Sequence, residues 1–172
     1  MDAICVIGGS GFIGTRSCRS MTGGGFRIAD IRQSPEFHSE HSDVRRLEDM
    51  LSAIRDGDVI VNLAAEHRDD VYPKSLYDEV NVDGARNICA AARAKNVRKI
   101  IFTSSVAVYG FAPKDTDEAG AINPFNDYGR TKYEAEQVYR EWQAESLDTR
   151  TLVIVRLTVV SSNRTVAMFI TC

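Results

Sequence analysis

Two side chains with acid–base potential stand four positions apart in the segment Tyr128-Gly129-Arg130-Thr131-Lys132. Positions i and i+4 of an α-helix share one face, so a helix here would place the phenol and the ammonium one turn apart. A nearby ammonium lowers the pKa of a phenol, which could then accept a proton near neutral pH. The pair is a candidate for proton abstraction, although the same spacing also occurs on ordinary solvated helix faces.

A glycine cluster follows the first apolar run of the chain. Gly8, Gly11 and Gly14 come directly after Ala3–Ile7, a short stretch rich in β-branched residues that predicts a buried strand. In a turn from strand to helix, Gly8 permits the tight bend, Gly11 lets the backbone approach a pyrophosphate, and Gly14 lets the helix pack closely. The helix amino terminus then offers free N–H groups to the anion. An ordinary glycine-rich turn is the alternative.

An acidic residue stands where a dinucleotide site would need one. Asp30 ends the second expected strand, about 20 residues after the glycines, where a carboxylate can accept hydrogen bonds from the adenosine ribose. The same carboxylate would repel a 2′-phosphate, which favours NAD over NADP, although Arg32 could soften the preference. A solvated acid at a strand end is the alternative.

An alternation of strands and helices must position these residues. Strands are expected at Ala3–Ile7, Phe26–Ala29, Val59–Leu63, Lys99–Thr103 and Leu152–Val160, and helices after the glycine turn and at Leu47–Ile54, Leu76–Lys95 and Tyr128–Ser146. A polar loop is expected at Pro113–Pro124. The alternation predicts right-handed crossovers and a Rossmann-type α/β fold, a doubly wound parallel sheet with helices on both faces.

The composition excludes several classes of protein. The 172 residues are 44% hydrophobic and 26% charged, which suits one globular domain rather than a disordered chain. A net charge of −3 gives no basic field for nucleic acid. No segment predicts a signal peptide or a transmembrane helix, so a cytoplasmic protein is expected. The four cysteines, Cys5, Cys18, Cys89 and Cys172, lack metal-ligand spacing, and neither a metal site nor a disulfide is expected.

Taken together, the motifs resemble the short-chain dehydrogenase/reductase superfamily, and in particular its extended branch, the NAD-dependent epimerase/dehydratase family. The GxxGxxG spacing and YxxxK carry the resemblance, which runs from residue 3 to about residue 157. Asp43-Val44 looks like the family's adenine-facing pair, Asn62-Leu63-Ala64-Ala65 like its cofactor-lining strand end, and Asn81 like its helix asparagine. The cofactor contacts that the resemblance implies are Gly8, Gly11, Phe12, Ile13, Gly14, Asp30, Asp43, Val44, Leu63, Ala64, Ala65, Asn81, Tyr128 and Lys132.

The resemblance also implies a reaction and three catalytic residues. Ser105, in Ile101–Gly110, matches the family's serine and joins Tyr128 and Lys132. In such an enzyme, Tyr128 takes the proton from a sugar 4-hydroxyl while hydride passes to NAD, and the resulting 4-keto sugar turns and receives the hydride on its other face. Ser105 would hydrogen-bond the reacting oxygen, and Lys132 would bind the nicotinamide ribose.

Ala64–Val71, Asn126–Arg130 and Arg140–Trp142 are similar to bacterial epimerases of surface-polysaccharide synthesis, which invert carbon 4 of N-acetylglucosaminyl diphosphate undecaprenol on the way to O-antigen and lipopolysaccharide. This implies a sugar on a diphosphate carrier, undecaprenyl or nucleotide, and a protein that is cytoplasmic, either free or peripheral at the inner membrane face. A homodimer through Leu76–Lys95 and Tyr128–Ser146 is expected. No role is assigned to the polar loop residues of Ala64–Val71.

The family pattern fails near the carboxyl terminus. Arg156 matches the first residue of the family's Arg-Pro-Thr stretch, but Leu157 replaces the proline, and Ser161-Ser162 replace an aromatic residue and a glycine. We therefore expect an NAD-binding Rossmann domain over residues 1–160 and an aberrant tail over 161–172, without the family's substrate lobe. A frameshift near Val160 would explain the tail.

Two other functions stay open. A nucleotide-sugar dehydratase or reductase uses the same serine, tyrosine and lysine, but a dehydratase usually has acidic residues just after the serine segment, where Val106-Ala107 stand. A catalytically silent NAD-binding remnant would follow from the missing lobe, because epimerisation needs a site that grips the diphosphate.

Overall fold

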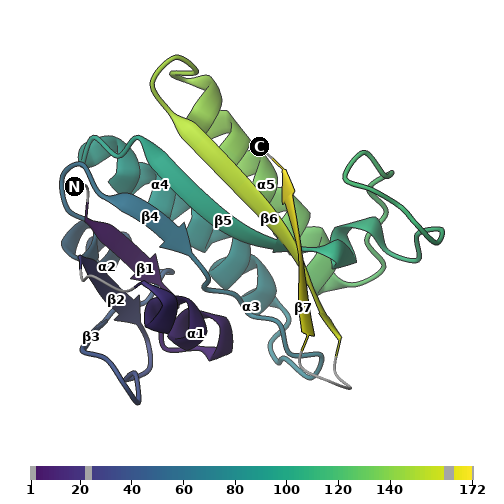
Figure 1. The fold of residues 1–172 in the computed structure, drawn as a ribbon, viewed down its shortest axis with the longest axis horizontal. Helices are drawn as coiled ribbons and strands as arrows, with labels where there is room; N and C mark the ends of the chain where they lie inside the picture. Colours follow the sequence, from purple (N-terminus) through teal and green to yellow (C-terminus); the bar gives the residue numbers. More distant parts are fainter. Residues whose placement is uncertain (1–2, 22–24, 161–164, 172) are drawn as a thin grey trace.

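The protein is built on one seven-stranded sheet (Figure 1). The computed structural model describes residues 3–21, 25–160 and 165–171, with side chains as far as Leu157. The strands are β1 (Ile4–Ile7), β2 (Phe26–Asp30), β3 (Ser39–His41), β4 (Val59–Asn62), β5 (Lys99–Ser105), β6 (Thr151–Val160) and β7 (Thr165–Thr171). Their order is β3-β2-β1-β4-β5-β6-β7; all neighbours are parallel except β6 and β7, which are antiparallel.

Helices lie on both sides of this sheet. They are α1 (Phe12–Ser20), α2 (Leu47–Ala53), α3 (Ser75–Tyr77), the π-helix η1 (Asp78–Asp83), α4 (Gly84–Ala94), the 3₁₀-helix η2 (Val106–Tyr109) and α5 (Asp127–Ala144). In Figure 1, α1 lies in front of the sheet, and α2, α4 and α5 lie behind it. The predicted Rossmann-type α/β fold is confirmed.

The core is divided by the sheet into two clusters of unequal size. The larger one lies under α2, α4 and α5, and its largest fully buried side chains include Trp142, Tyr139 and Phe102. The smaller one joins Val6 and Ile28 of the sheet to Cys18 of α1. Strand residues buried on both faces suit a parallel sheet, whose strands are apolar along most of their length.

The structure differs from the sequence predictions at three elements. The expected helix Leu76–Lys95 is a helical stretch from α3 to α4 that is interrupted by the π-helix η1. The short strand β3 was not predicted, because its three residues are polar and carry no hydrophobic alternation. Residues 165–171, placed in the expected tail, form the strand β7, while residues 161–164 and 172 lie outside the described residues.

Two glycines of the turn after β1 are required by close backbone contact. Gly8 has a φ of +78°, and a Cβ on it would lie 2.5 Å from the backbone nitrogen of Ala64. A Cβ on Gly14 would lie 2.4 Å from the carbonyl oxygen of Gly9. Gly11 differs from both, because the nearest atom to its Cβ position, the Gly8 carbonyl oxygen, is 3.5 Å away.

We predict that Gly14→Ala lowers the free energy of unfolding by roughly 2 kcal/mol or more, because the new methyl group meets backbone that cannot move aside. Gly11→Ala, at the helix N-cap, should lower it by no more than about 1 kcal/mol. Urea denaturation of both variants compares them. Equal losses of stability would contradict this assignment of the two glycines.

Candidate cofactor and catalytic site

The glycine turn lies against the segment that leaves β4. Gly8 is in contact with the backbone of Leu63 and Ala64, and the Ala64 N–H donates to Oδ1 of Asn62 over 3.0 Å. The helix α1 that follows has Gly11 as its N-cap and no side-chain cap. Its first N–H groups are therefore available to an anion, as a pyrophosphate site requires.

Asp30 fixes the shape of this turn. Its Oδ2 accepts from the Ser10 N–H and its Oδ1 from the Arg32 N–H, each over 2.9 Å, and the side chain is 7% exposed. The Ser10 hydroxyl donates in turn to the Arg32 carbonyl oxygen. The structure therefore gives Asp30 a role in ordering the glycine turn, and a bond to the adenosine ribose stays a prediction.

The expected adenine-facing pair is held against α4. Val44 is buried, and a Cβ on Gly84 would lie 3.0 Å from its side chain. The carbonyl oxygen of Val44 accepts from Nδ2 of Asn87 over 2.9 Å. The guanidinium of Arg45 hydrogen-bonds the Asp43 carboxylate and lowers the pKa of that group. The segment of Asp43 and Val44 is thus anchored by contacts within the protein.

The three expected catalytic residues come together where η2 meets the start of α5. Ser105 ends β5, and its Oγ accepts from the Ala107 N–H over 3.1 Å. A Cβ on Gly129 would lie 2.5 Å from the Ala107 carbonyl oxygen, so only glycine allows this approach of α5. Oδ1 of Asn126 caps α5 by accepting from the Gly129 N–H over 2.8 Å. This packing brings the phenol of Tyr128 within hydrogen-bonding reach of Ser105.

Burial sets the protonation of the Tyr/Lys pair. It raises the pKa of Tyr128, and the hydrogen bond with Ser105 acts in the opposite direction. The direction is the reverse of the sequence expectation, because the burial of the phenol itself outweighs the hydrogen bond with Ser105. Burial lowers the pKa of Lys132 to about 7, and its Nζ lies 4.2 Å from the centre of the Phe102 ring.

Asn81 supports the site through backbone and side-chain contacts. Its Nδ2 donates to the Glu66 carbonyl oxygen and to Oγ1 of Thr131, and its Oδ1 accepts from the Glu66 N–H. Both amide hydrogens are used within the protein. Asn81 therefore ties the loop after β4 to α5, one residue before Lys132, and its expected cofactor contact stays a prediction.

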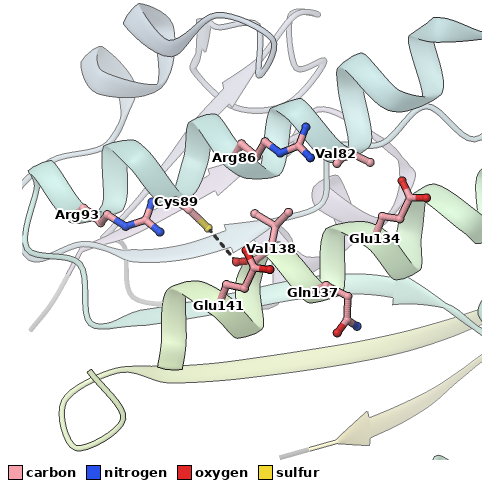
Figure 2. Close-up of a pocket in the computed structure, with 8 residues that line it drawn as sticks. All are labelled: Val82, Arg86, Cys89, Arg93, Glu134, Gln137, Val138 and Glu141. Atoms are coloured by element: carbon pink, nitrogen blue, oxygen red, sulfur yellow. Dashed lines mark hydrogen bonds between the residues drawn. The ribbon is translucent and has the colours of Figure 1, made fainter. Parts of the chain in front are cut away.

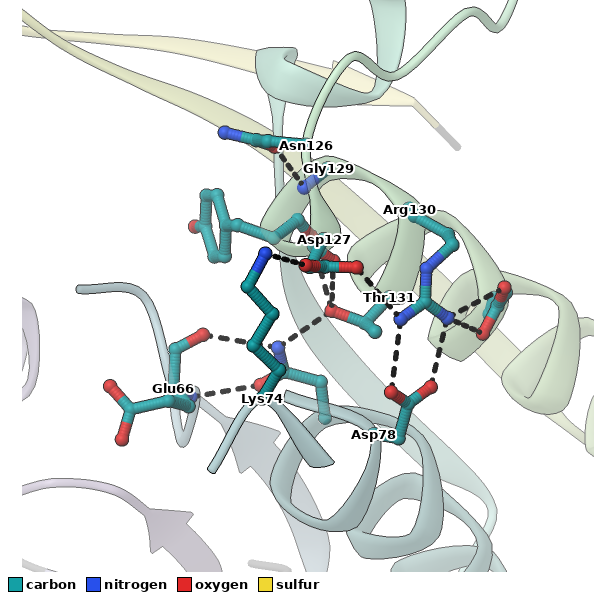
Figure 3. A network of polar contacts seen from close by, with 11 residues as sticks. Glu66, Lys74, Asp78, Asn126, Asp127, Gly129, Arg130 and Thr131 are labelled. Atoms are coloured by element: carbon teal, nitrogen blue, oxygen red, sulfur yellow. Dashed lines mark hydrogen bonds and ion pairs between the residues drawn. The ribbon is translucent and has the colours of Figure 1, made fainter. Parts of the chain in front are cut away.

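A second set of contacts, not predicted from the sequence, clamps the start of α5 to η1. The guanidinium of Arg130 donates to both carboxylate oxygens of Asp78, over 2.8 and 2.9 Å, and also pairs with Glu134 and Asp127 (Figure 3). Lys74 pairs with Asp127 over 3.6 Å. The pairs of Arg130 with Asp78 and of Lys74 with Asp127 join segments about 50 residues apart, which single-sequence patterns do not reveal.

The remaining expected contacts lie around the turn and the end of β4. Phe12 is exposed at the start of α1 with the Arg16 guanidinium over its ring, and Ile13, Leu63, Ala64 and Ala65 are half-buried. Among the described residues, no cluster of metal-binding side chains occurs, and no helix is long and apolar enough to cross a membrane.

Comparison with known proteins decides the family. The model of the NAD dependent epimerase/dehydratase family matches residues 4–172. The chain belongs to this family. It is 44% identical, over 167 residues, to the N-acetyl-alpha-D-glucosaminyl-diphospho-ditrans,octacis-undecaprenol 4-epimerase of Escherichia coli O157:H7, a match that covers 95% of this chain and 50% of that protein.

The more distant relatives include a sugar epimerase and a member of the short-chain dehydrogenase/reductase superfamily. A UDP-glucose 4-epimerase of Rhizobium leguminosarum bv. trifolii is 29% identical, with 82% of this chain and 47% of that protein covered. A short-chain dehydrogenase/reductase superfamily protein from Agrobacterium tumefaciens, solved with bound NAD, has a TM-score of 0.80 and 26% identity, with 90% of this chain and 48% of that chain covered. The chain spans about half the length of the curated relatives it matches.

The lowered pKa of Lys132 predicts a pH-dependent stability. Between about pH 7 and 10.5, the ordinary lysine pKa, residue 132 is protonated more often in the unfolded chain than in the folded chain. The cost of burying the Lys132 ammonium therefore lowers the stability fully below pH 7, and this loss of stability shrinks as the pH rises to 10.5. Lys132→Met should therefore raise the free energy of unfolding at pH 7 by on the order of a few kcal/mol, and by less at pH 10.

Chemical denaturation at both pH values tests this, with Lys99→Met, which removes an exposed lysine of β5, as the matched control. The control should show no such pH-dependent difference. An equal effect of Lys132→Met at pH 7 and pH 10 would mean that the ammonium is not desolvated.

Proposed function

We propose that the protein is the catalytic and NAD-binding half of a sugar 4-epimerase. The observation that carries the proposal is the meeting of Ser105, Tyr128 and Lys132 at the carboxyl end of β5, on the same sheet edge as the glycine turn. Ligands of open α/β sheets bind at this edge, where the strand order reverses. The domain organisation proposed with it is an NAD-binding domain over residues 1–160, followed by residues 161–172.

The residues present fit a bound dinucleotide. The uncapped start of α1 and the open space beside Gly11 accommodate a pyrophosphate, and Asp30 offers a carboxylate at the end of β2. Leu63, Ala64 and Ala65 would line the cofactor, Asp43 and Val44 would face its adenine, and Lys132 would bind its nicotinamide ribose. When bound, NAD supplies a hydride acceptor that later returns the hydride to the sugar.

The protein side chains have distinct parts in this reaction. Tyr128 takes the proton of the sugar 4-hydroxyl and returns it after the 4-keto sugar has turned. The Ser105 hydroxyl hydrogen-bonds the reacting oxygen and steadies the charge that develops on it. Lys132, one turn from Tyr128, would hold the cofactor beside the phenol and, when it carries its proton, would offset part of the burial effect that raises the pKa of Tyr128.

The substrate class we propose is a sugar on a diphosphate carrier. The Escherichia coli relative is named for a lipid-linked N-acetylglucosaminyl diphosphate, and other relatives for UDP-glucose. A lipid carrier of that kind would bring the protein to the inner face of the membrane as a peripheral enzyme of surface-polysaccharide synthesis. The first substrates to test are therefore N-acetylglucosaminyl diphosphate undecaprenol and UDP-N-acetylglucosamine.

We predict that Tyr128→Phe lowers epimerisation by roughly 100-fold or more and leaves NADH binding intact, because only the proton-transferring hydroxyl is lost. Tyr133→Phe, on the same helix, is the matched control and should keep full activity. Epimerisation is followed by chromatography of the product sugars, and binding by NADH fluorescence. Binding without turnover by the wild-type chain would favour a catalytically silent module instead.

We also propose a homodimer formed through α4 and α5. A hollow of about 350 Å³ runs between them (Figure 2). It is lined by Val82, Arg86, Cys89 and Arg93 on one side and by Glu134, Gln137, Val138 and Glu141 on the other. The first side carries two arginines and the second two glutamates, so a two-fold partner could place opposite charges together.

The dimer predicts that Val138→Arg, in the floor of the hollow, converts the protein to a monomer in sedimentation velocity experiments, because it buries a charge at the contact. Leu147→Arg changes an exposed residue beyond the end of α5 and should leave the dimer intact. A wild-type chain that sediments as a monomer would exclude this assembly.

A further inference from the structure

The Lys132 ammonium is buried without a direct partner for its charge. The side chain is 2% exposed, and among the described residues it makes no hydrogen bond and no ion pair. Its one aromatic contact is the ring of Phe102. An ammonium in such surroundings should attract any carboxylate within reach.

The Glu136 carboxylate lies one helical turn from Lys132 but pairs with other groups. Glu136 is one helical turn after Lys132 on the same face of α5, and it is fully buried. Its Oε1 accepts from the Ser104 hydroxyl over 2.6 Å and from Nε of Arg156 over 2.9 Å. Its Oε2 accepts from Nη2 of Arg156 over 2.6 Å. The carboxylate that acts on Lys132 is thus already paired with Arg156.

Arg156 is itself fixed by several elements. It lies on β6 directly opposite Ser104 of β5, and its side chain is 6% exposed. Besides Glu136, it donates to the hydroxyl of Tyr109 in η2 over 2.5 Å and to the carbonyl oxygen of Glu118 over 3.3 Å. The guanidinium therefore has one orientation, and a planar two-point contact transmits this orientation to the carboxylate.

We propose that Arg156 is a positioning residue that holds the Glu136 carboxylate away from the Lys132 ammonium and so keeps this ammonium free for the cofactor and Tyr128. The proposal deepens the proposed function and rests on it for the part that Lys132 plays. Without the two-point contact, Glu136 could rotate onto Lys132, as glutamate and lysine at this spacing do on helices. A buried pair of that kind would pull the ammonium out of the site.

The electrostatics of the site agree with this arrangement. Among the side chains that the structure describes, Glu136 is the charged group whose field acts on Lys132: it raises the lysine pKa, while burial has the larger effect and lowers it to about 7. The other ionisable neighbours are Tyr128, one turn before Lys132, and Tyr139, whose ring packs on Phe102. With Glu136 already paired, burial is the larger effect on Lys132.

The test is the titration of Lys132 in the wild-type chain, Arg156→Met, Glu136→Gln and the double variant. Side-chain ¹³C NMR of labelled lysine follows the titration without any cofactor, and Lys132→Met assigns the signal. Arg156→Met should raise the midpoint by about one pH unit or more, because the released carboxylate pairs with the ammonium. Arg156→Met/Glu136→Gln should lose this rise and titrate at or below the wild-type midpoint, because the carboxylate that raises the lysine pKa is gone. A merely structural role of Arg156 would not produce this reversal.

An unchanged midpoint in Arg156→Met, or an equal upward shift in the double variant, would overturn the proposal. If Arg156→Met does not fold, Arg156→Lys replaces it: a one-point cation should give a smaller upward shift, and no shift overturns the proposal. Since the titration needs no NADH, a wild-type chain that fails to bind NADH would refute the proposed function and leave this result standing. Where NADH does bind, Arg156→Met should weaken the binding and the double variant should recover it.

Discussion

The close contact between the glycine turn and the backbone leaving β4 is the constraint on which the rest of the site depends. Glycine is the only type of residue that fits at position 8, since φ is +78° there and any Cβ would overlap the Ala64 backbone. The contact joins β1 and β4 at the point where the strand order reverses. It also sets the direction of α1, whose uncapped amino terminus points its free N–H groups toward the same edge of the sheet.

A second close contact positions the candidate catalytic residues. Because Gly129 lets α5 approach the Ala107 carbonyl, the first turn of α5 lies next to the end of β5. Further along the same helix, the buried pair of Glu136 and Arg156 joins α5 to β6. One helix thus carries the Tyr128 phenol and Lys132 ammonium of the proposed catalytic pair together with the Glu136 carboxylate, and each of the three side chains contacts the sheet.

Much of this arrangement could be predicted from the sequence, because its signals are local. A glycine turn between an apolar run and a helix, an acid at the next strand end, and YxxxK each express a short-range requirement of the backbone or of helix geometry. The fold class and the family follow from their order, and both are confirmed.

What the sequence did not reveal depends on contacts between distant segments. The π-helix that divides Leu76–Lys95 contains Asn81, whose side-chain amide hydrogen-bonds Glu66 and Thr131. The lowered pKa of Lys132 depends on the burial of its whole surroundings, and no pattern of spacing contains that information. The ion pair of Arg156 likewise joins two elements that only the folded sheet brings together.

Whether the glycine turn of this chain binds NAD can be measured by fluorescence titration of the purified wild-type protein and Gly11→Ala with NADH. We expect saturable binding by the wild type and binding weakened roughly tenfold or more in Gly11→Ala, since a methyl group there would obstruct the pyrophosphate without disturbing the fold. Ser20→Ala, at the far end of α1, should bind as the wild type does. Equal binding by wild type and Gly11→Ala, or none by either, would mean that the glycine turn is not an NAD site.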